Sequence, residues 1–491
     1  QPIRIHPDNP KLFEFRGKPL MLLTATEHYG AVMNRPFDYR KYLADAAAKG
    51  MTLTRLFLLF RELQSAVNPY STCKPESTDY ISPFPRTGPG RAADGLPRYD
   101  LDKWNPEFFE RLHGFVGLAS EYGIIVEVVL LSNTYAPEVW GLNPLHAANN
   151  LSELKDIPWW EYNTLRDEQR VAVQLAHVRK AVTELNAYDN VVFELCNEPG
   201  GGLGGPEHPT PAETNEWLKA VAQAICETEA DLPNRHLIFG QEAFTYTPWE
   251  QPSTLSFGEF PLDVVNMHPL PNTTYQSASW DMGTFMSGEL KLHAVRDYCL
   301  ATWEAGKPLN LDEDNVASRF MDPVGWTIHR KRAWATLLSG AHYDYIDFSI
   351  HPWRESGTPD SQKYVRSWFG YLSQFVHSLP LAKCKPLPEV IVYCPPPLLP
   401  VVFGAPDEEV AIYLADEREQ EEPGCGEVIR TGVELALAPG KWRVACFSPT
   451  TGVYSPELEL VSDRKLRLEL PEFRHDLAVY QIGRASCRER V

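Results

Sequence analysis

The chain of 491 residues is too long for one ordinary hydrophobic core, so we expect one large domain and one smaller domain. Its composition, 43% hydrophobic and 23% charged, is that of a globular protein. The net charge of −19 argues against nucleic acid and anionic membrane surfaces as partners, and no apolar run approaches the ~20 residues of a membrane helix.

Residues 12–380 alternate apolar strands with amphipathic helices, a pattern typical of βαβ units and a parallel sheet. Eight strands fit this stretch, at residues 20–24, 52–59, 124–131, 191–195, 236–239, 263–267, 308–313 and 345–349. They predict an α/β fold, a (β/α)8 TIM barrel, over residues 1–384. The long loops at about 61–103 and 134–164 follow strands two and three, on the face where barrels carry their active sites.

The pattern changes after residue 384, where short alternating strands replace the mixture of helices and strands. The run Pro395-Pro396-Pro397 interrupts regular structure, and turns such as Pro439-Gly440 separate the strands. We therefore expect a small antiparallel β-sandwich domain over residues 385–482.

The sequence begins with Gln1 rather than Met, so we expect either a mature form or a fragment. A removed signal peptide would explain this start and would favour a secreted or periplasmic protein over a cytoplasmic one, although no such segment is visible. Residues 483–491 read as a translated sequencing adapter, and we treat them as a non-native tail.

Residues 191–199 give the clearest chemical signal in the chain. They read as an apolar strand that ends in Asn197 and Glu198 and is stopped by Pro199. Glu313 ends the seventh strand in a similar way. Because the carboxyl ends of all barrel strands meet on one face, the two glutamates would face each other across the barrel mouth. A pair of carboxyls facing across a cleft is what glycosidic bond cleavage needs.

These motifs resemble those of glycoside hydrolase clan A, barrel enzymes that include cellulases, mannanases and β-galactosidases. That family has Asn-Glu-Pro after strand four and a second Glu after an apolar strand introduced by Lys-Pro, which residues 197–199 and 307–313 match. The resemblance implies a carbohydrate substrate and no cofactor or metal. It makes Glu198 the acid/base and Glu313 the nucleophile of a retaining double displacement.

The resemblance also implies residues that hold the sugar and tune the site. Asn197 would bond the sugar 2-hydroxyl, and Arg55 on strand two would pair with the nucleophile and keep it ionised. His268 after strand six would contact the nucleophile. Trp353 after strand eight would form the aromatic floor of the −1 subsite.

Three more residues at strand ends are candidates for substrate binding. Asn133 ends the third strand, where the family usually has a histidine. His28 and Tyr29 follow the first strand and could line the −1 subsite, although a histidine satisfied within the core is an equal alternative.

The choice of carboxylates keeps alternatives. Asp312 and Asp314 flank Glu313, where the family usually has small or apolar neighbours, so either could replace it as the catalytic acid. Glu242 after strand five is a rival acid, but no Asn precedes it.

Two other classes of function remain open. One is a non-catalytic carbohydrate-binding protein on an inactive barrel, which a displaced Glu313 with no facing carboxyl would indicate. The other is a metal-dependent barrel hydrolase, but no HxH pair follows the first strand and the nine cysteines lack CxxC spacing. Its candidate ligands would be His28, His268, His342 and His351. Sugar, linkage and oligomeric state do not follow from the sequence.

Overall fold

The computed structural model describes residues 1–27, 30–61, 76–200, 205–243, 252–268, 291–314, 323–418 and 422–483. Eight parallel strands form the centre of its larger part, which confirms the predicted barrel. Around the sheet they are β4 (Leu23–Thr26), β13 (His342–Ile346), β12 (Leu309–Asp314), β11 (Val264–Met267), β10 (Ile238–Gly240), β9 (Val191–Glu194), β8 (Ile125–Val129) and β5 (Leu53–Phe57).

Two strands at the ends of this sheet, β4 and β5, meet and nearly close the barrel. The Thr52 amide donates to the Leu23 carbonyl at 3.0 Å, and the Arg55 amide donates to Thr26 Oγ1 at 3.1 Å. Closure brings the carboxyl ends of all eight strands onto one face, so residues far apart in the chain can share a site there.

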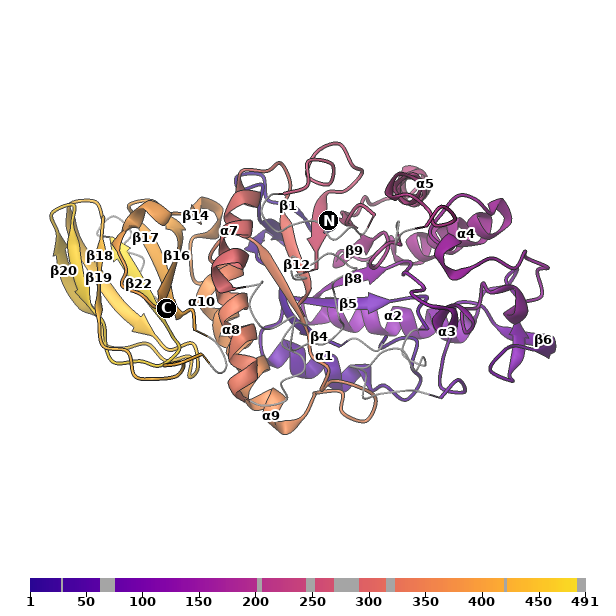
Figure 1. Cartoon of the computed structure of the whole chain (residues 1–491), viewed down its shortest axis with the longest axis horizontal. Helices are drawn as coiled ribbons and strands as arrows, with labels where there is room; N and C mark the ends of the chain where they lie inside the picture. The colour runs from indigo at the N-terminus through magenta and orange to yellow at the C-terminus, as the bar shows by residue number, and fades with distance from the viewer. Residues whose placement is uncertain are drawn as a thin grey trace.

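Helices connect the strands and cover the outside of the barrel (Figure 1). The long ones are α1 (Tyr39–Ala48), α2 (Pro106–Glu121), α4 (Glu168–Leu185), α5 (Pro211–Ala230), α7 (Leu292–Trp303), α8 (Pro323–Leu337) and α10 (Ser367–His377). Local sequence explains where they begin. Thr210 and Glu213 form a reciprocal capping box at the start of α5, and Pro211 fills its first turn.

The loops add short elements to the barrel. After β5 and β8 these are the hairpin β6 (Arg86–Arg91) and β7 (Pro97–Tyr99), α3 (Pro137–Trp140), η2 (Ala147–Asn149) and η3 (Trp159–Glu161). After β13 they are α9 (Pro359–Ser361), η4 (Gln362–Arg366), η5 (Leu381–Lys383) and η6 (Pro388–Val390).

Two predicted strands lie elsewhere than expected. The run at 20–24 spans the end of β3 (Lys18–Leu20) and the start of β4, and β3 pairs with β2 (Phe13–Phe15), which pairs with β1 (Arg4–Ile5) in an antiparallel sheet. Its apolar side chains pack with those from the first residues of the barrel strands, such as Val192 and Val264. The last barrel strand is residues 342–346 rather than 345–349.

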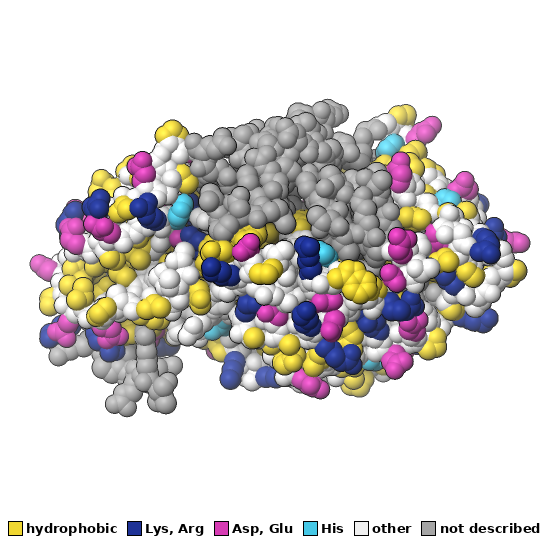
Figure 2. Space-filling model, turned by 90° about the horizontal axis from the view of Figure 1, so that it is seen from below, with side chains coloured by type: hydrophobic (Ala, Val, Ile, Leu, Met, Phe, Trp, Pro, Cys, Tyr) yellow, Lys and Arg dark blue, Asp and Glu magenta, His cyan; other side chains and the backbone are white. Residues whose placement is uncertain are grey.

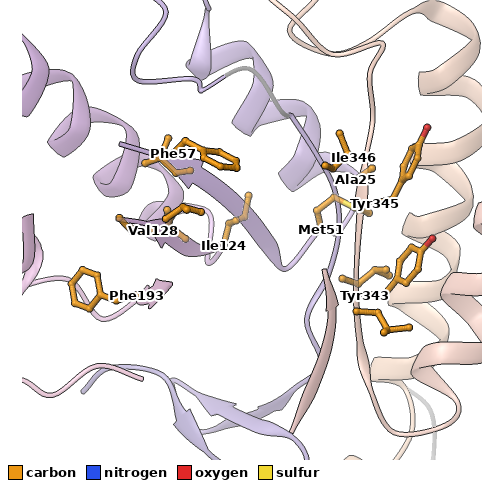
Figure 3. Packing of buried hydrophobic residues seen from close by; sticks show 14 of the residues in the cluster. Ala25, Met51, Phe57, Ile124, Val128, Phe193, Tyr343, Tyr345 and Ile346 are labelled. Carbon is orange, nitrogen blue, oxygen red and sulfur yellow. The ribbon is translucent and has the colours of Figure 1, made fainter. Parts of the chain in front are cut away.

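Strand β13 shows how one strand serves two layers. Tyr343 and Tyr345 point toward the neighbouring helices (Figure 3), where both rings contact Phe369 of α10 at centroid distances of 5.8 and 6.2 Å. Successive side chains of a strand alternate between its faces, so Asp344 points into the barrel.

Two antiparallel sheets follow the barrel and confirm the predicted β-sandwich. The larger has the order β14 (Lys385–Pro386), β16 (Leu398–Ala405), β17 (Glu409–Asp416), β22 (Asp476–Gly483), β19 (Gly440–Phe447) and β20 (Leu458–Ser462). The smaller has the order β15 (Ile391–Tyr393), β18 (Gly432–Leu435) and β21 (Leu466–Glu469). Side chains such as Ile412, Val433 and Leu468 form the core between them.

The other face of the larger sheet packs on the barrel helices beside it (Figure 1). Trp334 of α8 stacks on Tyr413 of β17 with ring centroids 5.1 Å apart. Arg330 of α8 makes a buried bidentate ion pair with Asp476 of β22, at 2.8 and 2.6 Å. One continuous hydrophobic cluster therefore joins the barrel helices to the sheet.

Charged side chains of both signs are interspersed over the surface seen in Figure 2. Among the helices of the described chain, none has the length and apolar character needed to span a membrane.

Candidate active site

The two glutamates stand at the carboxyl ends of β9 and β12 in an unusual backbone conformation. Their φ angles are +43° for Glu198 and +53° for Glu313, in the left-handed region that non-glycine residues rarely occupy. Such conformations cost about 1–3 kcal/mol and concentrate at functional sites.

The two carboxyl groups meet around one imidazole. His268, just beyond β11, places Nδ1 2.8 Å from Glu198 Oε1 and 3.4 Å from Glu313 Oε2. A carboxylate oxygen from each glutamate and a ring nitrogen of His268 all lie within 4.8 Å of one another. Retaining glycosidases hold their two carboxyls about 5–5.5 Å apart and inverting ones about 6.5–9.5 Å apart. The close approach of these two oxygens is compatible with the retaining geometry.

Arg55 ties three strands together beneath this pair. Its guanidinium forms a bidentate pair with Glu194 of β9, at 2.7 Å for both contacts, and also binds Glu313 directly. Burial alone would lower the pKa of Arg55, but the carboxylates of Asp312, Glu194 and Glu313 raise it well above the ordinary value. The arginine thus supplies a fixed positive charge to the site.

Tyr135 joins Asn197 to Glu198. The Asn197 amide donates to the Tyr135 hydroxyl at 2.7 Å, and this hydroxyl donates to Glu198 Oε2 at 2.8 Å. Asn133 fixes the two loops that carry them, because its Oδ1 accepts from the Tyr135 amide at 2.8 Å and its Nδ2 donates to the Glu198 carbonyl at 2.9 Å. The Glu198 carboxyl is therefore held by the Tyr135 hydroxyl and the His268 imidazole.

The surroundings push the two glutamates in opposite directions. Burial raises the pKa of Glu313 to about 7, against the opposing effects of His268 and Arg55. Burial would also raise the pKa of Glu198, but hydrogen bonds from His268 and Tyr135 outweigh it and hold that pKa below the ordinary value. Because the two carboxyls interact, they titrate as a unit, in which Glu313 keeps its proton to higher pH than Glu198.

Two groups of side chains have ligand atoms close enough to share a cation. They are Glu198, His268 and Glu313 in the mouth, and Glu127, Glu194 and Asp312 beneath it. In both groups a guanidinium or an imidazole of the chain already contacts the carboxylates, so we assign no metal ligand. Of the three described histidines proposed for a metal site, His268 belongs to the first group, and His342 and His351 belong to neither.

The structure thus brings together five of the residues predicted from sequence: Arg55, Asn197, Glu198, His268 and Glu313. The Asn133 side chain adjoins them through its hydrogen bonds with the Tyr135 amide and the Glu198 carbonyl. His28 and Tyr29 lie outside the described residues. Trp353 follows β13 with φ +78° and is 74% exposed, so its place as the floor of a −1 subsite stays a prediction.

Two of the rival acids, Asp314 and Glu242, have other partners, whereas Asp312 lies within the site, 3.4 Å from His268 Nε2. Asp314 accepts hydrogen bonds from Arg332 of α8 at 2.9 Å and from the Tyr343 hydroxyl at 2.5 Å, so it faces the helical layer. Glu242 accepts from Ser256, at 2.6 Å from the hydroxyl and 3.1 Å from the amide. Neither carboxylate takes part in the contacts around His268.

Two residues of this site were not anticipated from sequence. Tyr135 carried no signal beyond its position two residues after Asn133, and its φ of +52° cannot be predicted from sequence. Glu194 lies inside an apolar strand, four residues before Glu198, and this unusual charge in a buried run was the available signal. Asp312 was noted as a departure from the family pattern and as an alternative to Glu313, but not as a partner of His268.

Comparisons with known proteins support the fold. A family model described as a domain of unknown function (DUF6298) matches residues 77–154, and no curated protein matches. A glycoside hydrolase family 5 structure from Bacteroides vulgatus is similar, with a TM-score of 0.62 and 12% identity, over 99% of this chain and 93% of that chain. Another structure, described as a glycoside hydrolase, has a TM-score of 0.59 and 11% identity, over 99% and 97%. The chain therefore shares its fold, over nearly its whole length, with these two glycoside hydrolase structures.

Proposed function

We propose that the chain is a retaining glycoside hydrolase that cleaves β-glycosidic bonds of an oligo- or polysaccharide. The observation that carries this proposal is the approach of the Glu198 and Glu313 carboxyls to within 4.8 Å at the carboxyl end of one barrel. The fold shared with a family 5 glycoside hydrolase structure makes this function more plausible, but fold alone does not determine function.

In the first half of the proposed reaction, the Glu313 carboxylate attacks the anomeric carbon while Glu198 gives its proton to the glycosidic oxygen. The bond between that carbon and oxygen breaks, and a glycosyl ester forms on Glu313. In the second half, Glu198 takes a proton from water, which attacks the same carbon and releases Glu313. Two inversions give net retention.

The surrounding charges suit both halves. Arg55 stabilises the Glu313 carboxylate when the ester forms and breaks. The single proton of the free pair must lie on Glu198 when the glycosidic bond breaks. His268 Nδ1 contacts both carboxylates and offers a path for this transfer.

The test is a pair of isosteric substitutions, Glu198→Gln and Glu313→Gln, after aryl β-glycosides and plant and microbial polysaccharides have been screened for a substrate. Each should lower kcat by roughly 10³-fold or more, because each removes a group that takes part in the chemistry. NMR should show that the first product has the β configuration. Glu242→Gln is the matched control and should keep activity.

Near-normal turnover in Glu198→Gln or Glu313→Gln would remove that residue from the mechanism. An α product would replace retention with inversion. Sugar binding without turnover in the unaltered chain would favour the carbohydrate-binding alternative, and loss of activity with a chelator would favour a metal-dependent reaction.

A further inference from the structure

A layer of buried acids lies under the catalytic pair. Side chains of Glu127, Glu194, Asp312 and Asp344 come from β8, β9, β12 and β13, and all four are 0% exposed. Branched apolar residues normally fill a barrel at this depth. The Arg55 pair accounts for Glu194, but the reaction proposed above uses neither of the aspartates.

Asp312 contacts the imidazole that bridges the catalytic glutamates. Its Oδ2 lies 3.4 Å from His268 Nε2, 3.2 Å from Arg55 Nε and 3.3 Å from Asn266 Nδ2. The other ring nitrogen of His268 faces the two catalytic carboxyls. An aspartate on one nitrogen of an imidazole fixes its orientation and stabilises its charged form.

Asp344 is the neighbour of Asp312 on the adjacent strand. Burial and the adjacent Asp312 carboxyl raise the pKa of Asp344 well above its ordinary value, whereas Arg55 and His268 outweigh burial and hold the pKa of Asp312 below its own. No N–H or O–H group elsewhere in the described part of the chain reaches either oxygen of Asp344. Two neighbouring buried carboxyls cannot both ionise easily, and they can share a hydrogen bond only when one of them keeps its proton. Because Asp312 faces a guanidinium, an imidazole and an amide, the proton belongs on Asp344.

We propose that Asp312 is a positioning residue that keeps His268 a charged imidazolium directed at Glu198 and Glu313, and that Asp344 is its protonated partner. The role in catalysis rests on the proposed glycosidase reaction, whereas the charge of His268 does not. An imidazolium between the two glutamates stabilises the negative charge that passes from one to the other during the two displacements.

The charged groups around His268 agree with this assignment. Glu194 and Glu198 approach from β9, Asp312 and Glu313 from β12, and Arg55 of β5 binds three of these four carboxylates. Burial alone would lower the pKa of His268, but Glu313, Asp312 and Glu198 together raise it well above the ordinary value.

The experiment compares Asp312→Asn with Asp344→Asn, two equally buried aspartates in mutual contact. Asp312→Asn removes the charge that His268 needs, so kcat should fall roughly 10–100-fold. In Asp344→Asn an amide N–H replaces the carboxyl O–H as the donor to Asp312, so the loss should be much smaller. Nitrogen NMR of labelled histidine, assigned with His268→Gln, should show His268 protonated from pH 6 to 8 in the unaltered chain and in Asp344→Asn, but not in Asp312→Asn.

The NMR readout separates this proposal from the proposed function, because it needs no substrate. A neutral His268 at pH 7 in the unaltered chain overturns the proposal even if the chain hydrolyses glycosides, and this holds if Asp312→Asn fails to fold. Equal losses of kcat in the two variants would also overturn it. They would show that Asp344→Asn removes a negative charge as Asp312→Asn does, and therefore that Asp344 is not protonated. A protonated His268 in a chain without glycosidase activity would support the charge assignment and reject the catalytic role.

Discussion

At the scale of single residues, the proton shared by the catalytic pair predicts the pH dependence of activity. Burial raises the pKa of Glu313 to about 7, so above this pH the two glutamates lose the proton they share and Glu198 can no longer receive it from Glu313. kcat/KM should therefore fall about tenfold per pH unit above 7. The acid limb should lie below 4.5, the ordinary value for Glu198, because His268 and Tyr135 hold that pKa down.

The measurement is kcat/KM against pH for an aryl glycoside whose leaving group needs protonation. A substrate with an activated leaving group, such as 2,4-dinitrophenol, serves as the control. It needs no acid, so it should lose less activity at alkaline pH. Activity that rises between pH 7 and 9 would contradict the shared proton.

The Tyr135 hydroxyl gives a second prediction at this scale. In Tyr135→Phe, Glu198 loses one of the hydrogen bonds that lower its pKa, and the Asn197 amide loses its acceptor. We expect kcat to fall about tenfold, which corresponds to one hydrogen bond of roughly 1.4 kcal/mol, and the acid limb of the pH profile to move to higher pH. Tyr80→Phe is the control, since the Tyr80 hydroxyl has no hydrogen-bond partner within the described residues. An unmoved acid limb in Tyr135→Phe would show that the hydroxyl only fills space.

At the scale of elements, the chain's strands were predictable where their side chains follow a simple rule. β5, β8, β9 and β11 are largely apolar, and their predicted positions overlap the observed ones; the prediction for β12 also overlaps, although this strand mixes two leucines with polar and acidic residues. β13 was placed three residues too late, because His342 and Asp344 point into the barrel and break the apolar pattern of a buried strand. The first strand was misplaced because one apolar run supplies both β3 and β4, and periodicity does not mark the boundary.

The residues of the site likewise divide into those that the sequence predicts and those that it does not. Glu198, Glu313, Arg55, Asn197 and His268 each lie on or just after a barrel strand, and the barrel's topology alone predicts that strand ends meet. Tyr135 lies in the loop after β8, where its position depends on a left-handed turn and on the Asn133 side chain. Asp344 is a neighbour of Asp312 because β12 pairs with β13. The predicted strand at 345–349 did not include residue 344, so this contact could not be anticipated.

At the scale of the whole molecule, the C-terminal sheets share a core with the barrel. Helix α8 connects them to the site. Arg330 on this helix binds Asp476 of β22, and Arg332 on the same helix binds Asp314, the residue after Glu313. Rings of Trp334 and Tyr413 close the apolar interface beside the ion pair. The sheets therefore support the helix that backs the strand of the proposed nucleophile, and we expect the two parts to unfold together.

Asp476→Asn tests this coupling. It leaves the Arg330 guanidinium buried without a counter-charge, which typically costs 3–5 kcal/mol when a buried ion pair is broken, so the free energy of unfolding should fall by about that amount. The matched control is Glu408→Gln, which breaks the Lys383–Glu408 pair between the same two parts of the chain; these side chains are 60% and 36% exposed, so the loss should be about 0–1 kcal/mol. Urea unfolding followed by tryptophan fluorescence and by enzyme activity should give coincident single transitions in both variants, displaced to lower urea for Asp476→Asn. An early transition of the sheets that leaves activity intact would show that the barrel is stable without them.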